Sequence, residues 1–209
     1  PPGGWRLATP ATRALFLKGF QQRTLLQYEM IGHAEAGKGP LVICLDLSGS
    51  MTQGHIEAKA AVLALMTVAH REHRWVQVIA FDNRVMGSWM FPGRGEINLE
   101  AVLDFAEMAP AGGTRPYPAV KHAQTTILSD MEFQVADIVI ITDGDCAFNE
   151  RDLDLRDELK AQGVRLHGVG IGIDIHHSPY MKAVCDTLVS CEDMCAPNEA
   201  TDHLVTTVL

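Results

Sequence analysis

The sequence predicts an α/β domain with a doubly wound, mostly parallel central sheet and helices on both faces. Two short continuous apolar runs, Leu41–Asp46 and Ala136–Thr142, are typical of strands buried on both faces. Segments with apolar residues at helical spacing separate such runs, and this alternation favours a parallel sheet covered on both sides. The composition, 47% hydrophobic and 21% charged over 209 residues, is that of an ordinary globular domain.

Local signals order the expected elements along the chain. Helices follow apolar residues at helical spacing, and strands follow continuous or alternating apolar runs. The turn at Asp82-Asn83-Arg84 joins two strands as a hairpin, and the second of them is expected to be the antiparallel edge. Gly163 is a natural end for the helix before it. The expected strands are 41–46, 75–81, 85–91, 136–142 and 165–173, and the expected helices are 12–31, 55–71, 99–108, 118–131, 150–162, 180–188 and 199–208.

The chain is expected to contain two regions. Residues 1–39 are interpreted as a lead-in and helix that end a longer helical region, and residues 40–209 as the domain itself. The first residue is Pro1 rather than Met, which indicates a piece of a longer protein. No apolar stretch reaches the ~20 residues of a membrane span, and no signal-peptide pattern is present. Five cysteines, with Cys44 inside an apolar run, favour a reducing, cytoplasmic setting.

The charge balance bears on the kind of partner. Seventeen basic and 26 acidic side chains give a net charge of −9 at pH 7. Nucleic-acid binding rests on clustered Lys and Arg, so this balance argues against nucleic acid as the main ligand. It suits a cation, or a partner with a basic surface. No Gly-rich phosphate-binding loop is present, so the chain is not expected to hydrolyse nucleotides.

Oxygen-bearing side chains gather at the predicted carboxyl ends of two strands and in a Gly-Gly-Thr segment between them. In an open α/β sheet, ligands bind at this edge, where the strand order reverses. An all-oxygen set without His or Cys selects a hard cation, which predicts an Mg²⁺ site, with Mn²⁺ or Ca²⁺ as alternatives. The expected ligands are Asp46, Ser48, Ser50, Thr114 and Asp143.

These residues carry a specific resemblance. Asp46-x-Ser48-x-Ser50, followed by Thr114 and Asp143-Gly144, resembles the metal-ion-dependent adhesion site of von Willebrand factor A domains. The resemblance implies that the first four side chains contact the metal directly or through water, and that Asp143 commonly does so through water. It also implies that a Glu or Asp of a partner protein occupies an open coordination position.

The residues before the first strand resemble a narrower branch of that family. Leu25-Leu26-x-Tyr28, and Gly39-Pro40 directly before Leu41, are similar to bacterial ViaA and CoxE-type proteins. In that branch the domain ends a longer helical protein and works with a MoxR-type AAA+ ATPase. The resemblance therefore implies a non-enzymatic adaptor whose client presents an acidic residue. Asp145 departs from the branch, which often has an apolar residue there, and we expect it to cap the next helix.

Other functions remain open at this stage. One is a related adaptor, the von Willebrand A subunit of a metal chelatase or of a rubisco activase complex. A second is an extracellular adhesion module, and a third is an Mg²⁺-dependent hydrolase. A serine nucleophile is disfavoured because neither Ser48 nor Ser50 lies in a Gly-x-Ser-x-Gly elbow. The plainest alternative is that Asp46 and Asp143 only cap helices.

Two further groups of residues are candidates for contacts. Four residues close to the predicted site would face a partner: Met51, Arg115, Tyr117 and Asp145. Near the C-terminus, thiols and an imidazole of the types that bind zinc occur at Cys185, Cys191, Cys195 and His203. Their spacing matches no common zinc pattern, so buried small hydrophobic residues are the preferred interpretation of the cysteines.

Overall fold

The computed structural model describes residues 39–144, 146 and 149–191. Its strands are β1 (Leu41–Asp46), β2 (Val76–Phe81), β3 (Val85–Phe91), β4 (Asp137–Thr142), β5 (Leu166–Ile171) and β6 (Thr187–Cys191). Its α-helices are α2 (His55–Arg71), α3 (Leu99–Glu107), α4 (Tyr117–Ser129), α5 (Glu150–Ala161) and α6 (Pro179–Val184). Three short 3₁₀ turns complete the described part, η1 (Gly49–Thr52), η2 (Met131–Phe133) and η3 (Ile175–His177).

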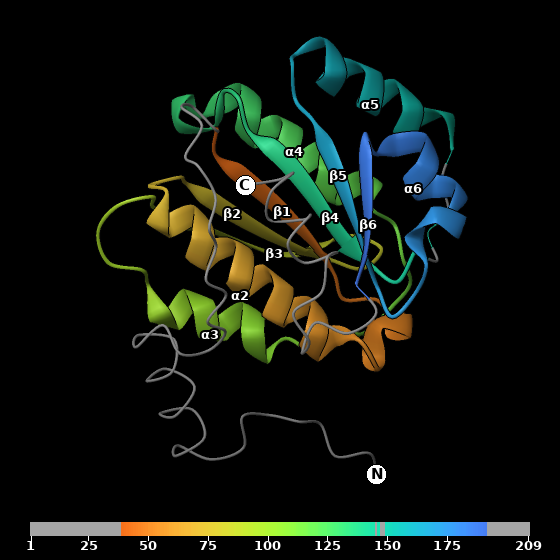
Figure 1. Cartoon of the computed structure of the whole chain (residues 1–209), viewed down its shortest axis with the longest axis horizontal. Coiled ribbons are helices and arrows are strands. Elements are labelled where there is room, and N and C mark those ends of the chain that lie inside the picture. Colours follow the sequence, from red (N-terminus) through yellow and green to blue (C-terminus); the bar gives the residue numbers. More distant parts are fainter. Residues whose placement is uncertain (1–38, 145, 147–148, 192–209) are drawn as a thin grey trace.

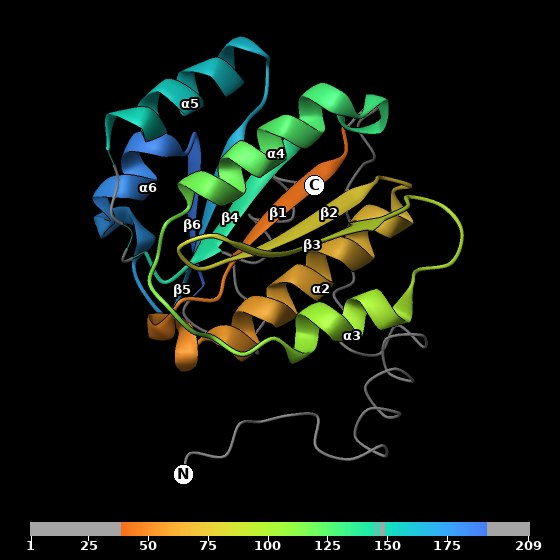
Figure 2. The same cartoon turned by 180° about the vertical axis from the view of Figure 1, so that it is seen from behind.

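The strands form one twisted sheet in the order β3-β2-β1-β4-β5-β6. Every neighbouring pair is parallel except β2 and β3, which pair antiparallel at the edge of the sheet. Helices α2 and α3 lie on one face (Figure 1), and α4, α5 and α6 lie on the other (Figure 2). The predicted doubly wound sheet with one antiparallel edge strand is therefore confirmed.

The apolar runs are buried on both faces, as their composition predicted. In β1, Leu41, Ile43 and Leu45 belong to the core under α2 and α3, whereas Val42 and Cys44 belong to the core under α4 and α5. Burial raises the pKa of the Cys44 thiol to about 12, so this cysteine stays protonated and behaves as a small apolar side chain.

One element was predicted wrongly. The helix expected at 180–188 is only the six-residue α6, and the chain then turns into β6. Asp186 fixes this turn, because its backbone N–H donates to the carbonyl of Leu166 at 2.7 Å and its carboxylate accepts from the N–H of Leu166 at 2.9 Å. Pairing with β5 therefore overrides the helical spacing of this stretch. The helices expected at 12–31 and 199–208 lie outside the described residues.

Candidate metal site at the carboxyl edge of the sheet

The site lies where the sheet reverses its strand order. Strands β1 and β4 are neighbours, and Leu45 pairs with Ile141, so Asp46 and Thr142 end the two strands side by side. The chain leaves β1 toward α2 on one face, and leaves β4 toward α5 on the other. In doubly wound sheets, ligands bind at such a point, where the strand order reverses.

Asp46 is the fixed carboxylate of this edge. Its side chain is fully buried, and its two oxygens accept hydrogen bonds from different donors. The Ser48 backbone N–H donates to Oδ1 at 2.8 Å, and the Thr142 hydroxyl donates to Oδ2 at 2.6 Å. Burial raises the pKa of Asp46 to about 6, with a smaller upward contribution from the Asp143 charge, while the hydrogen bonds act in the opposite direction. A cation bound here would favour the charged carboxylate.

The hydroxyl groups of Ser48 and Ser50, which follow Asp46 in the chain, lie beside each other. Ser48 is buried and Ser50 is exposed, and their hydroxyl oxygens lie 3.0 Å apart. The loop that holds them is tied to the segment before Thr114, since the Gly49 N–H donates to the carbonyl of Gly112 at 3.0 Å. Two adjacent hydroxyls and a buried carboxylate thus come from one short stretch of chain.

Thr114 lies in a loop that is packed on both sides. Gly112 adopts a φ of +74°, and a Cβ at this position would lie 2.5 Å from Oδ2 of Asp82. The Arg115 N–H donates to the carbonyl of Asp82 at 2.9 Å, which holds the loop against the β2–β3 turn. Thr114 is half-buried, and no hydrogen bond of its side chain to another described residue of the site is found.

Asp143 supplies the second carboxylate. It is half-buried, and its buried Oδ1 atom accepts no hydrogen bond from any described residue. Buried carboxylate oxygens normally have partners, so this atom is one that a cation would satisfy. Within the described residues, no group of three or more His, Cys, Asp or Glu side chains could hold a metal ion. A cation at this edge therefore depends on hydroxyl and water ligands beside Asp46 and Asp143, a set that fits Mg²⁺.

A comparison with protein families decides which family the chain represents. Residues 41–145 match the model of the von Willebrand factor type A domain. The chain belongs to this family. The von Willebrand factor type A structure from Catenulispora acidiphila has the same fold, with a TM-score of 0.61 and 17% identity, and the match covers 83% of this chain and 43% of that one.

Two curated relatives are similar in sequence to this von Willebrand A domain. The uncharacterized protein MJ0811 of Methanocaldococcus jannaschii is 30% identical over 181 residues, which cover 86% of this chain and 40% of the relative. The regulatory protein ViaA of Edwardsiella ictaluri is 32% identical over 113 residues, which cover 53% of this chain and 22% of ViaA. The chain therefore spans well under half of the length of either relative.

The sequence analysis missed Thr142, whose hydroxyl donates the hydrogen bond that orients the Asp46 carboxylate in this domain. Thr142 is fully buried at the end of β4, and its hydroxyl also accepts from the Gly144 N–H at 3.1 Å. Its signal was its position, because the last residue of a strand beside Asp46 must place its side chain next to that carboxylate. Such a hydroxyl orients the carboxylate rather than contacting the ligand.

The described residues that were expected to contact a partner differ in their exposure to solvent. Met51 is 1% exposed and packs in the core, so its side chain is not available to a partner. Arg115 is exposed, and Tyr117 is half-buried against the core under α4. Asp145 lies outside the described residues, but the helix that it was expected to cap begins at another residue. The N-cap of α5 is Asn149, which forms a capping box with Asp152.

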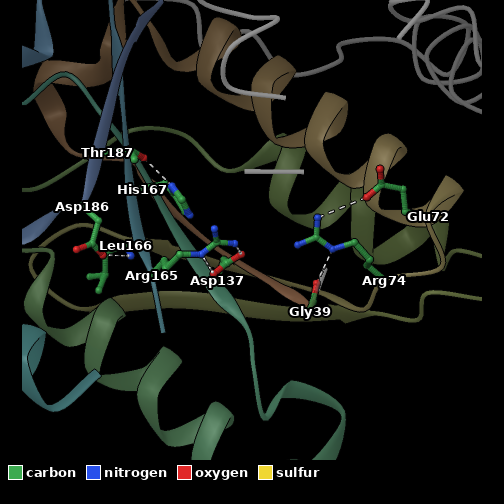
Figure 3. Close-up of polar contacts among 9 residues, drawn as sticks. All are labelled: Gly39, Glu72, Arg74, Asp137, Arg165, Leu166, His167, Asp186 and Thr187. Atoms are coloured by element: carbon green, nitrogen blue, oxygen red, sulfur yellow. Dashed lines mark hydrogen bonds and ion pairs between the residues drawn. The ribbon is translucent and has the colours of Figure 1, made fainter. Parts of the chain in front are cut away.

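A second polar cluster lies at the opposite, amino edge of the sheet (Figure 3). Asp137 is buried and accepts two hydrogen bonds from Arg165, at 3.0 and 2.6 Å. His167 is buried with its Nδ1 atom 2.6 Å from the Thr187 hydroxyl, and burial lowers the pKa of its imidazole. These contacts join β4, β5 and β6, so we assign the cluster a structural role.

Among the zinc candidates named from the sequence, three offer no described side chain: Cys191, Cys195 and His203. The described helices include none that could span a lipid bilayer.

Proposed function

We propose that this von Willebrand A domain is an Mg²⁺-dependent protein-binding module, not an enzyme, and that it acts as the adaptor of a MoxR-type AAA+ ATPase. The observation that carries the proposal is the buried Asp46 carboxylate beside Asp143, because the buried Oδ1 atom of Asp143 accepts no hydrogen bond within the described part of the chain. When bound at this site, Mg²⁺ supplies an open coordination position that a carboxylate of a client can occupy.

The residues of the chain have separate tasks in this proposal. Asp46, Ser48, Ser50 and Thr114 would hold the cation directly or through water, and Asp143 through water. Thr142 and the Ser48 N–H keep the Asp46 carboxylate in one orientation. The hydrogen bond from Gly49 to Gly112 keeps the serine loop beside the loop of Thr114. Binding of an acidic client would then depend on both the cation and this preset arrangement.

The proposed ATPase partner rests on similarity rather than on the site. The chain is 32% identical to part of ViaA, which is named as a regulatory protein, and the residues before β1 resemble the same branch. The proposal places the protein in the cytoplasm, where an AAA+ ATPase would use it to select a client. The match covers only 22% of ViaA, and the proposal assigns the ATPase contact to a part of the longer protein outside this domain.

Calorimetry with Mg²⁺ and Mn²⁺ tests the metal site. The parent chain should bind the cation saturably, and Asp46→Asn and Asp143→Asn should each weaken binding by about tenfold or more. Asp154→Asn is the matched control, because it removes the same charge from an exposed position on α5. Unchanged Mg²⁺ affinity in Asp46→Asn, with a native circular dichroism spectrum, would remove the basis of the proposal.

A pull-down with the purified MoxR-type ATPase and candidate clients tests the adaptor role. Client capture should require Mg²⁺, disappear with chelator, and disappear in Asp46→Asn but not in Asp154→Asn. Capture of the ATPase should not depend on the metal site if the remainder of the longer protein provides that contact. Client capture that is equal with and without chelator would contradict the metal-dependent mechanism.

A further inference from the structure

Two arginines flank the candidate metal site on adjoining loops. Arg84 lies in the β2–β3 turn, and Arg115 directly follows Thr114. The two loops are joined through Asp82, whose carbonyl accepts from the Arg115 N–H at 2.9 Å. The Asp82 N–H donates to the carbonyl of Arg84 at 3.0 Å, so all three residues belong to one packed unit.

The described residues leave both guanidinium groups open to solvent. Arg84 and Arg115 are exposed, and among the described residues neither forms an ion pair. The acidic side chain of the turn, Asp82, forms its hydrogen bond with the backbone. The Asp82 carboxylate accepts the backbone N–H of Arg84 at 2.9 Å and lies half-buried against Gly112. The Asp82 carboxylate therefore shapes the turn rather than pairing with the side chain of either arginine.

The position of this pair contrasts with the charge of the whole chain. The net charge is −9, yet two of the three loops that border the site, 47–54 and 109–116, contain no charged side chain other than Arg115, whereas the loop after β4 carries Asp143 and Asp145. A negatively charged partner would be attracted to the side of the site that is formed by the β2–β3 turn and the loop of Thr114. Long-range attraction between two net charges is screened beyond about 8 Å in physiological salt, so local charges decide which face a partner meets.

We infer that Arg84 and Arg115 form a basic rim beside the metal site. This rim binds one or more carboxylates of a client in addition to the carboxylate at the metal. The client would thus present a short acidic segment rather than a single Asp or Glu. This inference rests on the proposed function for the position of the first carboxylate. Guanidinium groups suit the task because they form paired hydrogen bonds with carboxylates.

The expected size of the effect follows from the exposure of the arginines. Exposed ion pairs contribute little individually, and salt screens them. Together the two arginines should strengthen binding of an acidic segment by about fivefold at low salt, and by less as the ionic strength rises. The contribution should persist without the cation, since neither guanidinium requires it. The metal and the rim can therefore be measured separately.

Three labelled peptides of equal length provide the probe, with three glutamates, with one glutamate, and with glutamines only. Fluorescence anisotropy in Mg²⁺ should show that the parent chain prefers the three-glutamate peptide over the one-glutamate peptide. The double variant Arg84→Gln/Arg115→Gln should lose that preference and keep its Mg²⁺ affinity. Arg71→Gln/Arg94→Gln is the matched control, because it removes two exposed charges near the amino edge of the sheet.

The outcomes separate the two proposals. A parent chain without preference for the three-glutamate peptide, or a preference that survives in Arg84→Gln/Arg115→Gln, overturns the inference. Loss of the preference equally in the control variant would also overturn it, because net charge alone would then be responsible. One-glutamate binding that is indifferent to chelator, with the arginine effect intact, would contradict the proposed function but not the charge of the rim.

Discussion

The Thr142 hydroxyl donates a 2.6 Å hydrogen bond to Oδ2 of Asp46 and thereby joins the carboxyl ends of β4 and β1. The Thr142 hydroxyl oxygen also accepts a hydrogen bond from the Gly144 N–H at 3.1 Å and lies 3.6 Å from the Cys146 sulfur. Thr142 therefore fixes both the carboxylate of β1 and the beginning of the loop that carries Asp143. Its position makes it the support of the candidate site rather than one of its ligands.

Replacement of Thr142 by Val should separate the effect of the hydroxyl hydrogen bond from the effect of side-chain packing. Valine keeps the shape of the side chain but removes the donor, which leaves Oδ2 of the buried Asp46 carboxylate without this hydrogen bond. We expect a loss of about 1–3 kcal/mol in the free energy of unfolding and a loss of about tenfold in Mg²⁺ affinity. Urea denaturation and calorimetry measure the two effects. Thr142→Ser, which keeps the hydroxyl, should recover most of the affinity, and equal losses in both variants would contradict this role.

A glycine prediction concerns the loop of Thr114. Gly112→Ala combines a positive φ with a Cβ only 2.5 Å from the Asp82 carboxylate, so the Asp82 side chain or the loop must shift, and Asp82 holds the turn that packs against this loop. Gly163→Ala is the matched control, because its φ is +78° and its Cβ would meet nothing within 4 Å. Both variants should lose about 1 kcal/mol of stability to backbone strain. Only Gly112→Ala should also weaken Mg²⁺ binding, and equal Mg²⁺ affinities in the two variants would show that the loop position is unimportant.

The sequence predicted the sheet well because buried parallel strands leave a strong local signal. β1 was predicted with its observed bounds, and α2 likewise, since both are governed by apolar patterns within the element itself. β6 was missed because its stability comes from pairing with β5, a contact far away in the sequence. Leu188 continues the apolar spacing of Tyr180 and Val184, so the local pattern favoured one longer helix.

The candidate site was predicted in the same uneven way. Asp46 and Asp143 could be placed at one edge because Asp46 ends one predicted strand and Asp143 directly follows another. Thr142 was missed, because hydrogen bonding to Asp46 depends on which strands are neighbours. Met51 was misplaced for a related reason, since its position after the serines gives no sign that η1 turns its side chain into the core.

Lys59 gives a prediction about alkaline pH. Its ammonium group donates to the carbonyls of Ala106 and Met108, at 2.9 and 2.5 Å, and so ties α2 to the end of α3. Burial lowers the pKa of Lys59 from its ordinary 10.5 to about 8. Between these values the unfolded chain binds more protons than the folded chain. The contribution of Lys59 to stability therefore rises as the pH increases from about 8 to about 10.5.

Lys59→Met should remove that rise. We expect the difference in unfolding free energy between the parent and the variant to grow in favour of the parent over this pH range. Its slope should stay below about 1.4 kcal/mol per pH unit, the limit for one proton. Urea denaturation at a series of pH values measures it. Lys182→Met removes an exposed lysine and should leave the pH dependence unchanged. A parent-minus-variant difference for Lys59→Met that is flat with pH would show that Lys59 is solvated in the folded protein.

The amino-edge cluster gives a prediction that the metal site should not share. Asp137→Asn removes the charge from a buried carboxylate that accepts two hydrogen bonds from Arg165, and so weakens the tie between β4 and β5. The expected loss is about 1–3 kcal/mol of unfolding free energy with unchanged Mg²⁺ affinity. Asp157→Asn breaks an ion pair with Arg156 in which the Asp157 side chain is 68% exposed, and it should cost less than about 0.5 kcal/mol. Equal costs for the two variants would mean that the Asp137–Arg165 pair contributes no more than a surface contact. A fall in Mg²⁺ affinity in Asp137→Asn would instead show that the two edges of the sheet are coupled.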